Sequence, residues 1–214
     1  MNLIVSDFDG TFFDENYEEN IKFINSIRDK YDFVIATGRH FKSLSSELKI
    51  ECDYYICNDG SYILDKNKNI IYKNYINQKS IETVYNRMLE LGYDDYFFDY
   101  IDGFGTELKD NITKLSIRIT DNTKNNDIDY LISDLEDVYG YISTNWINII
   151  SIESKKENGI EEILKYKNYN KIIVFGNEIN DYGMLDKYDG YLISKKFNNK
   201  YKTLEKFIDI KKKL

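Results

Sequence analysis

Short apolar runs alternate with segments of helical periodicity at the start of the chain, and this alternation limits the possible folds more than any other feature. Apolar runs at 3–5, 33–36 and 54–57 predict three buried strands. Between them, residues 18–30 carry Ile and Phe at helical spacing, and a shorter helical pattern begins at Phe41. Strands and helices in this order predict a parallel sheet with right-handed crossovers, as in Rossmann-like α/β folds.

The alternation stops in the middle of the chain and then resumes. Residues 61–73 have the pattern of a hairpin. The segment that follows predicts a small α+β unit, with helices at 79–91 and around 128–135 and strands near 95–100, 114–119, 141–144 and 146–153. The α/β pattern returns with helices at 157–166, 179–187 and 199–210 and strands at 171–175 and 190–193. We therefore predict a core from 1–76 and 151–214, with helices on both faces of its sheet, and an inserted α+β cap domain at 77–150.

Composition and charge exclude several classes of protein. The 214 residues carry a net charge of -8, which repels the phosphates of nucleic acids and anionic lipids. No apolar run approaches the roughly 20 residues that span a bilayer, and the N-terminus lacks the basic flank of a signal peptide. We expect a cytoplasmic protein without nucleic acid or membrane partners, and a monomer and a homodimer both stay open.

Few residue types are available for catalysis other than acids, lysines and hydroxyls. His40 is the only histidine, which excludes a metal site with several His ligands and argues against a Ser-His-Asp hydrolase. We expect His40 itself at the surface, and Cys52 and Cys57 as reduced thiols near a strand. Any catalysis must come mainly from carboxylates, lysine, hydroxyls or a metal.

Polar clusters fall where predicted strands end or a helix begins. There are four of them, Asp7-Phe8-Asp9-Gly10-Thr11, Thr37-Gly38-Arg39, Lys155-Lys156 and Gly176-Asn177-Glu178-Ile179-Asn180-Asp181. In open parallel sheets, ligands bind at the carboxyl ends of the strands. The predicted fold would therefore bring these distant clusters to one edge of the sheet.

The clusters also resemble those of a known family, the haloacid dehalogenase-like (HAD) phosphohydrolases, and within it the Cof-type group. Asp-x-Asp-Gly-Thr directly after a first apolar strand is a highly specific motif. Thr-Gly-Arg, a lysine before a late helix, and G-x-x-x-N-D follow in the right order. The resemblance covers essentially the whole chain, and the inserted segment matches that group's α+β cap, although it is small. It implies a Mg²⁺-dependent phosphatase of small phosphorylated metabolites, with sugar phosphates ahead of phosphorylated cofactors.

The resemblance assigns catalytic roles to Asp7, Asp9, Thr37 and Lys156. Asp7 would attack phosphorus and form an aspartyl-phosphate, because a metaphosphate-like transition state demands little of the nucleophile. Asp9 would protonate the departing alcohol and then deprotonate the attacking water. Thr37 would donate its hydroxyl to a phosphoryl oxygen, and Lys156 would neutralise charge on Asp7. The family register favours Lys156 over Lys155, although Glu157 stands where relatives more often have glycine.

Substrate contacts are expected from Gly38, through its amide, and from Arg39, Asn58 and Asn180. A surface ion pair is an equal alternative for Arg39. The candidates for selecting the leaving group are Asn58, Asp59, the Asp102-Gly103-Phe104-Gly105 loop and Trp146. Cap packing or a surface turn explains each of these candidates at least as well.

One position departs from the family pattern. Relatives have Gly-Asp-x-x-Asn-Asp, in which the first acid is a direct Mg²⁺ ligand, and this chain has Asn177 in its place. An amide oxygen can still bind Mg²⁺, which prefers hard oxygens, but the site loses one negative charge. Asp7, Asp181 and the main-chain carbonyl of Asp9 would complete the shell with waters. Glu178 is expected outside it.

Other functions stay open at this point. A phosphomutase would move the phosphoryl group within a sugar instead of transferring it to water. A catalytically weak member of the family would bind a phosphorylated ligand without turning it over, and Asn177 would be the sequence feature that indicates this. A receiver-type signalling domain also uses Asp, Thr and Lys, but its phosphoacceptor lies well inside the chain and it has no insert of about 70 residues.

Overall fold

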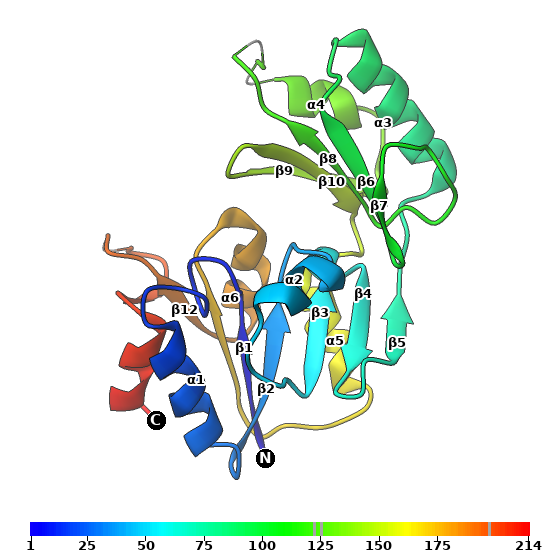
Figure 1. Ribbon diagram of the computed structural model, residues 1–214. Coiled ribbons are helices and arrows are strands. Elements are labelled where there is room, and N and C mark those ends of the chain that lie inside the picture. The colour runs from blue at the N-terminus through cyan, green and yellow to red at the C-terminus, as the bar shows by residue number, and fades with distance from the viewer. Residues whose placement is uncertain (122, 125, 197) are drawn as a thin grey trace.

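The structure is a computed structural model that describes residues 1–121, 123–124, 126–196 and 198–214. The chain forms a larger core, which carries both termini, and a smaller unit that lies above it in Figure 1. Within the described ranges, every helix is too short or too polar to cross a membrane.

The core is built on an eight-stranded sheet in the order β13-β12-β11-β1-β2-β3-β4-β5. Its strands are β1 (Asn2–Ser6), β2 (Tyr31–Ala36), β3 (Tyr54–Cys57), β4 (Tyr62–Asp65), β5 (Ile70–Lys73), β11 (Ile172–Gly176), β12 (Asp189–Ile193) and β13 (Lys202–Leu204). The strands from β13 to β3 run parallel, and β4 and β5 add an antiparallel hairpin at one edge. The predicted parallel sheet and hairpin are confirmed.

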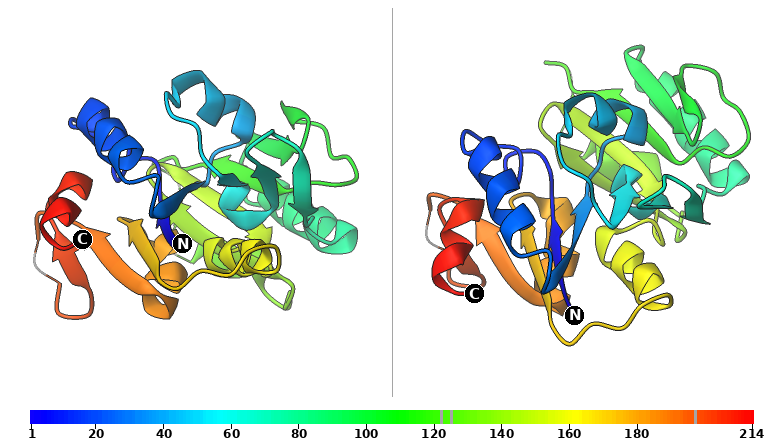
Figure 2. Two further views of the ribbon diagram at one scale, coloured as in Figure 1. Left: turned by 90° about the horizontal axis from the view of Figure 1, so that it is seen from below. Right: turned by 60° about the horizontal axis from the view of Figure 1, so that its bottom comes forward.

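Helices cover both faces of this sheet, as predicted. They are α1 (Tyr17–Ser26), α2 (Phe41–Glu47) and the 3-10 helix η3 (Phe207–Lys212) on one face, and α5 (Lys156–Leu164) and α6 (Tyr182–Lys187) on the other. Figure 2 shows blue α1 and yellow α5 on opposite sides of the core strands. Strand β1 is buried on both faces, because Ile4 packs into the α1 side while Leu3 and Val5 pack into the α5 side.

The smaller unit is a five-stranded antiparallel sheet in the order β7-β6-β8-β10-β9, and we call it the cap together with its two helices. Its elements are α3 (Gln78–Glu90), β6 (Tyr96–Tyr100), β7 (Gly103–Gly105), β8 (Lys114–Arg118), α4 (Asp127–Ile132), β9 (Val138–Ser143) and β10 (Trp146–Ser151). Ile81, Val84 and Met88 of α3 pack on one face of the sheet. The other face lies toward the core (Figure 1).

The predicted helix over 199–210 is wrong. The chain there forms β13, which pairs with β12 at the edge of the core sheet, and then the 3-10 helix η3. Leu204 is buried at the end of β13, and Phe207 and Ile210, one 3-10 turn apart, bury the inner side of η3.

Two elements of the cap also differ from expectation. Helix α4 ends at Ile132, short of Leu135, because Ser133 has a non-helical ψ of 139°, and Asp134 then adopts a left-handed backbone with φ of 62°. The expected loop at 102–105 contains strand β7, which pairs with the end of β6. Its three residues, with a glycine at each end, are too few to show a strand pattern in the sequence.

Candidate active site

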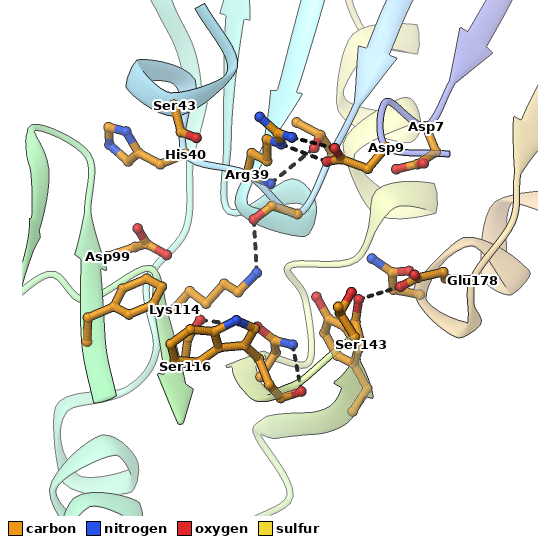
Figure 3. A pocket seen from close by; sticks show the side chains of 18 of the residues that line it. Asp7, Asp9, Arg39, His40, Ser43, Asp99, Lys114, Ser116, Ser143 and Glu178 are labelled. Carbon is orange, nitrogen blue, oxygen red and sulfur yellow. Dashed lines mark hydrogen bonds and ion pairs between the residues drawn. The ribbon is translucent and has the colours of Figure 1, made fainter. Parts of the chain in front are cut away.

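A cavity of about 720 Å³ lies between the carboxyl ends of the core strands and the open face of the cap sheet. The predicted site residues that line it are Asp7, Asp9, Thr37, Gly38, Arg39, Asn177 and Asn180. Figure 3 shows Asp7, Asp9 and Arg39 on the core side and Asp99, Lys114 and Ser116 on the cap side. The fold therefore brings three of the four polar clusters to one cavity.

The first cluster is positioned by the end of β1 and by a tight turn. The amide of Asp7 donates to the carbonyl of Phe175 at 2.9 Å, which continues the pairing of β1 with β11. Gly10 has a φ of 70°, a left-handed conformation that glycine adopts without a steric penalty. A Cβ at this position would lie 2.7 Å from Nδ2 of Asn177. Glycine is therefore required by the turn and by the close approach of the fourth cluster.

Lys156 joins the nucleophile candidate to the fourth cluster. Its side chain is fully buried, with Nζ 2.6 Å from Oδ1 of Asp7 and 2.7 Å from Oδ1 of Asp181. Although burial works against it, the carboxylates of Asp181 and Asp7 raise the pKa of Lys156 above its ordinary value. Lys155 lies elsewhere, with Nζ 4.4 Å from the ring centre of Tyr139. Of the two candidate lysines, Lys156 is therefore the one that contacts Asp7, as the spacing of the family motif had indicated.

Asp181 is held by three hydrogen bonds. Besides its contact with Lys156, its Oδ2 accepts from the amides of Asn177 and Glu178 at 2.8 and 2.9 Å. Asp7 differs, since among the described residues only its Oδ1 has a hydrogen-bond donor. Oδ2 of Asp7 is therefore the oxygen with a free lone pair at the head of the cavity.

The charge around Asp7 bears on whether a cation fits. Burial, together with the neighbouring carboxylates of Asp181 and Asp9, raises the pKa of Asp7 to about 8 against the effect of Lys156. A cation beside this carboxylate would favour its ionised form. The nearby donors are carboxylate and amide oxygens, which suit Mg²⁺. Within the described ranges, however, no three His, Cys, Asp or Glu side chains converge as a metal site. The residues present therefore fit Mg²⁺, although they supply less negative charge than a site with three carboxylates would.

Asn177 occupies the position where relatives carry an acid. Its Oδ1 accepts a hydrogen bond from the hydroxyl of Thr11 at 3.1 Å. To bind a cation, this amide must share that oxygen or rotate so that Thr11 receives its NH₂ group instead. The amide thus lines the same cavity as Asp7, but its oxygen already accepts a hydrogen bond.

Arg39 forms an ion pair with Asp9. An ion pair was the alternative to a substrate contact that the sequence left open for this residue. Its Nε lies 2.7 Å from Oδ2 of Asp9, and its Nη2 lies 2.5 Å from Oδ1 of the same carboxylate. Its Nη1 donates to Glu47 at 2.6 Å. This two-pronged contact holds Asp9 toward α2, so Asp9 must leave Arg39 before it can exchange a proton with a leaving group.

Comparison with known proteins decides the family. The family model of haloacid dehalogenase-like hydrolases matches residues 4–103 and 92–191. The chain belongs to the haloacid dehalogenase-like hydrolase family. The resemblance inferred from the sequence motifs is thereby confirmed. No curated protein matches the chain.

Solved structures of HAD proteins share the fold at low sequence identity. A HAD/COF-like hydrolase from Plasmodium vivax has a TM-score of 0.80 and 18% identity, over 95% of this chain and 89% of that chain. A HAD subclass IIB sugar phosphatase has a TM-score of 0.78 and 17% identity, over 99% and 95%. A HAD phosphatase from Bacteroides thetaiotaomicron has a TM-score of 0.76 and 14% identity, over 89% and 84%.

Asp59 links the HAD core to the cap. It lies in the 3-10 helix η1 (Asn58–Gly60) after β3 and is fully buried. It accepts hydrogen bonds from Asn180 at 2.8 Å, and from Lys114 at 3.1 Å and Tyr141 at 2.6 Å in the cap. Although burial works the other way, Lys114 lowers the pKa of Asp59, which stays ionised. Asp59 is therefore a docking point between the two units.

Two predicted positions need correction. Asn58 does not line the cavity, because it is fully buried and its amide donates to the hydroxyl of Thr113 at 2.8 Å. His40 is not a surface residue, because it is only 6% exposed. Its Nδ1 accepts from the amide of Lys42 and caps α2, and its Nε2 contacts the carbonyl of Ile101 at 3.1 Å. Burial lowers the pKa of His40, so the neutral ring is favoured.

Sequence reasoning missed the polar wall that the cap contributes. Lys114 and Ser116 line the cavity, whereas Leu115 and Ile117, which alternate with them on β8, belong to the cap core. This alternation of period two is visible in the sequence and is the signal that could have located the wall.

Proposed function

We propose that this protein is a Mg²⁺-dependent phosphatase that hydrolyses a small phosphorylated metabolite through an aspartyl-phosphate on Asp7. The observation that carries the proposal is the buried Asp7–Lys156–Asp181 arrangement at the head of the cavity. It leaves one oxygen of Asp7 facing the cavity while the ammonium of Lys156 offsets the buried charge. A cavity of about 720 Å³ has the size of sites that enclose small molecules.

The residues can divide the reaction into two displacements. In the first, Oδ2 of Asp7 forms a bond to phosphorus as the bond to the leaving oxygen breaks, and Asp9 gives its proton to that oxygen. In the second, Asp9 takes a proton from water, which attacks phosphorus and releases Asp7. The hydroxyl of Thr37 and the amide of Gly38 donate to phosphoryl oxygens in both steps.

A metal ion would add to this machinery. Asp7, Asn177, Asp181 and the main-chain carbonyl of Asp9 would hold Mg²⁺, which supplies positive charge beside the phosphoryl oxygens. Lys156 supplies the chain's own positive charge to Asp7. The cap would exclude water from the closed site.

The substrate class can be tested with a screen of phosphorylated metabolites in the presence of Mg²⁺. We expect phosphate release from at least one sugar phosphate or phosphorylated cofactor with a kcat/KM above that for p-nitrophenyl phosphate. Binding energy from the leaving group can lower the barrier only if the cap contacts that group. A folded protein that releases phosphate from none of these compounds would contradict the proposal and favour a protein that only binds its ligand.

Asn177 gives a separate prediction about the metal. Replacing Asn177 by Asp restores a negative charge, and desolvation of a third carboxylate offsets part of the gain. We expect the Mg²⁺ concentration for half-maximal activity to fall roughly tenfold, or about 1.4 kcal/mol. Asn177→Ala should raise it. The rate at saturating Mg²⁺ should change little in Asn177→Asp.

The measurement is a Mg²⁺ titration of phosphatase activity at one pH. A matched control is Asn170→Asp, which makes the same chemical change at an exposed position before β11, away from the cavity. It should leave the titration unchanged. Identical half-maximal concentrations in wild type, Asn177→Asp and Asn177→Ala would place residue 177 outside the metal shell. A wild type that is inactive until Asn177 is replaced by Asp would favour the catalytically weak alternative.

A further inference from the structure

Asp99 is a buried acid in the cap wall of the cavity, and the proposed mechanism does not use it. It lies on β6 and is only 4% exposed. Among the described residues, no hydrogen bond or ion pair reaches its carboxylate, although it lines the cavity. Burial raises its pKa to about 7. An ionised group in this position is costly unless a partner of opposite charge is bound.

The nearest basic residue already has other partners. Lys114 is the cross-strand neighbour of Asp99 on β8. Its Nζ donates to the carbonyl of Gly38 at 2.9 Å and to the carboxylate of Asp59 at 3.1 Å. The ammonium of Lys114 is therefore paired with Asp59, and among the described residues the carboxyl group of Asp99 has no ion-pair partner of its own.

Acidic side chains outnumber basic side chains in the described lining of the cavity. Its described lining includes the acids Asp7, Asp9, Asp99 and Glu178 and the basic residues Arg39, His40 and Lys114, of which His40 is favoured in its neutral form. Arg39 is paired with Asp9. Glu178 accepts a hydrogen bond from the neutral hydroxyl of Ser143. On the cap side of the cavity, Asp99 is therefore the acid that remains available to a ligand group with a positive charge.

Aromatic rings next to Asp99 support the same kind of ligand. Phe97 lies two residues before Asp99 on β6, and Phe104 is its cross-strand partner on β7. Both rings line the cavity, with centroids 6.3 Å apart. The faces of aromatic rings attract cations, although less strongly at an exposed ring such as that of Phe104, which is 60% exposed. A carboxylate beside two phenyl rings is thus a suitable site for an ammonium group.

We propose that Asp99 binds a protonated amine on the leaving group, so that the substrate is an amine-bearing phosphate monoester. This inference rests on the proposed phosphatase function. Figure 3 shows Asp7 on the core side and Asp99 on the cap side of the cavity of about 720 Å³ that both residues line. The phosphoryl group lies at Asp7, and the ammonium donates hydrogen bonds to the carboxylate of Asp99. A hydroxyl could also donate to Asp99, but it would not balance the charge.

The experiment compares matched substrates that differ only in an amine or a hydroxyl. Suitable pairs are 2-aminoethyl phosphate with 2-hydroxyethyl phosphate, and glucosamine 6-phosphate with glucose 6-phosphate. In at least one pair, we expect wild type to favour the amine by roughly 10- to 100-fold in kcat/KM, as for a hydrogen bond between charged groups. Asp99→Asn, which keeps the size of the side chain, should reduce that ratio to near one.

A control variant separates this effect from a general change of charge. Asp94→Asn removes an exposed acid that lies just before β6 and does not line the cavity, and it should keep the wild-type ratio. No amine preference in any pair, or a preference that survives in Asp99→Asn, would overturn the inference. Hydrolysis of p-nitrophenyl phosphate by wild type distinguishes this failure from failure of the proposed function, because that substrate has no amine.

Discussion

Replacement of Asp7 by Asn is expected to lower phosphatase activity at least about 10⁴-fold, the scale of losses seen when a covalent nucleophile is removed. The fold should persist, because Asn keeps the shape of the side chain and an oxygen that can accept from Lys156, which also retains Asp181. Burial already opposes the charge on Asp7. The variant should therefore melt within a few degrees of wild type.

The measurement is hydrolysis of p-nitrophenyl phosphate at saturating Mg²⁺, together with a thermal melt. Asp186→Asn is a matched control, since it changes an exposed acid on α6 outside the cavity and should keep wild-type activity. If folded Asp7→Asn retained more than a trace of Mg²⁺-dependent activity, Asp7 would not be the nucleophile.

Replacement of Asp9 by Asn should have the next largest effect, roughly 10²- to 10⁴-fold for an alkyl phosphate. The amide cannot protonate the departing alcohol or accept a proton from water. For an aryl phosphate the loss should be smaller, because a phenolate leaves without much help from an acid.

The comparison uses one alkyl and one aryl phosphate at the same pH and Mg²⁺ concentration. It also addresses the ion pair between Asp9 and Arg39. If Asp9 only anchors Arg39 and never exchanges a proton, both substrates should lose activity by the same factor. Equal losses would therefore rule out the acid and base role.

Most of the core could be predicted from the sequence, as could the part of the site that the core contributes. Strands β1, β2 and β11 are buried on both faces, so each is a continuous apolar run that stands out without other information. Asp7, Thr37 and Asn177 come directly after these runs, and their place at one edge of the sheet follows from parallel strand order. Strand β13 escaped notice because only Leu204 of its three residues is buried.

The cap half of the site depends on contacts that local patterns do not contain. The partnership of Asp59 with Lys114 joins residues 55 positions apart and exists only because the cap docks on the core. Asp99 belongs to the cavity for the same reason. His40 was misplaced because its burial depends on the carbonyl of Ile101, which another part of the chain supplies.

A direct test of the proposed function is phosphate release from p-nitrophenyl phosphate by the wild-type chain, with Mg²⁺, with EDTA, and with Mg²⁺ restored. We expect release with Mg²⁺, its loss in EDTA and its return when excess Mg²⁺ is added, because the proposed site holds Mg²⁺ with Asp7 and Asn177. Absence of release at every Mg²⁺ concentration, or release that EDTA does not affect, would contradict the proposed function.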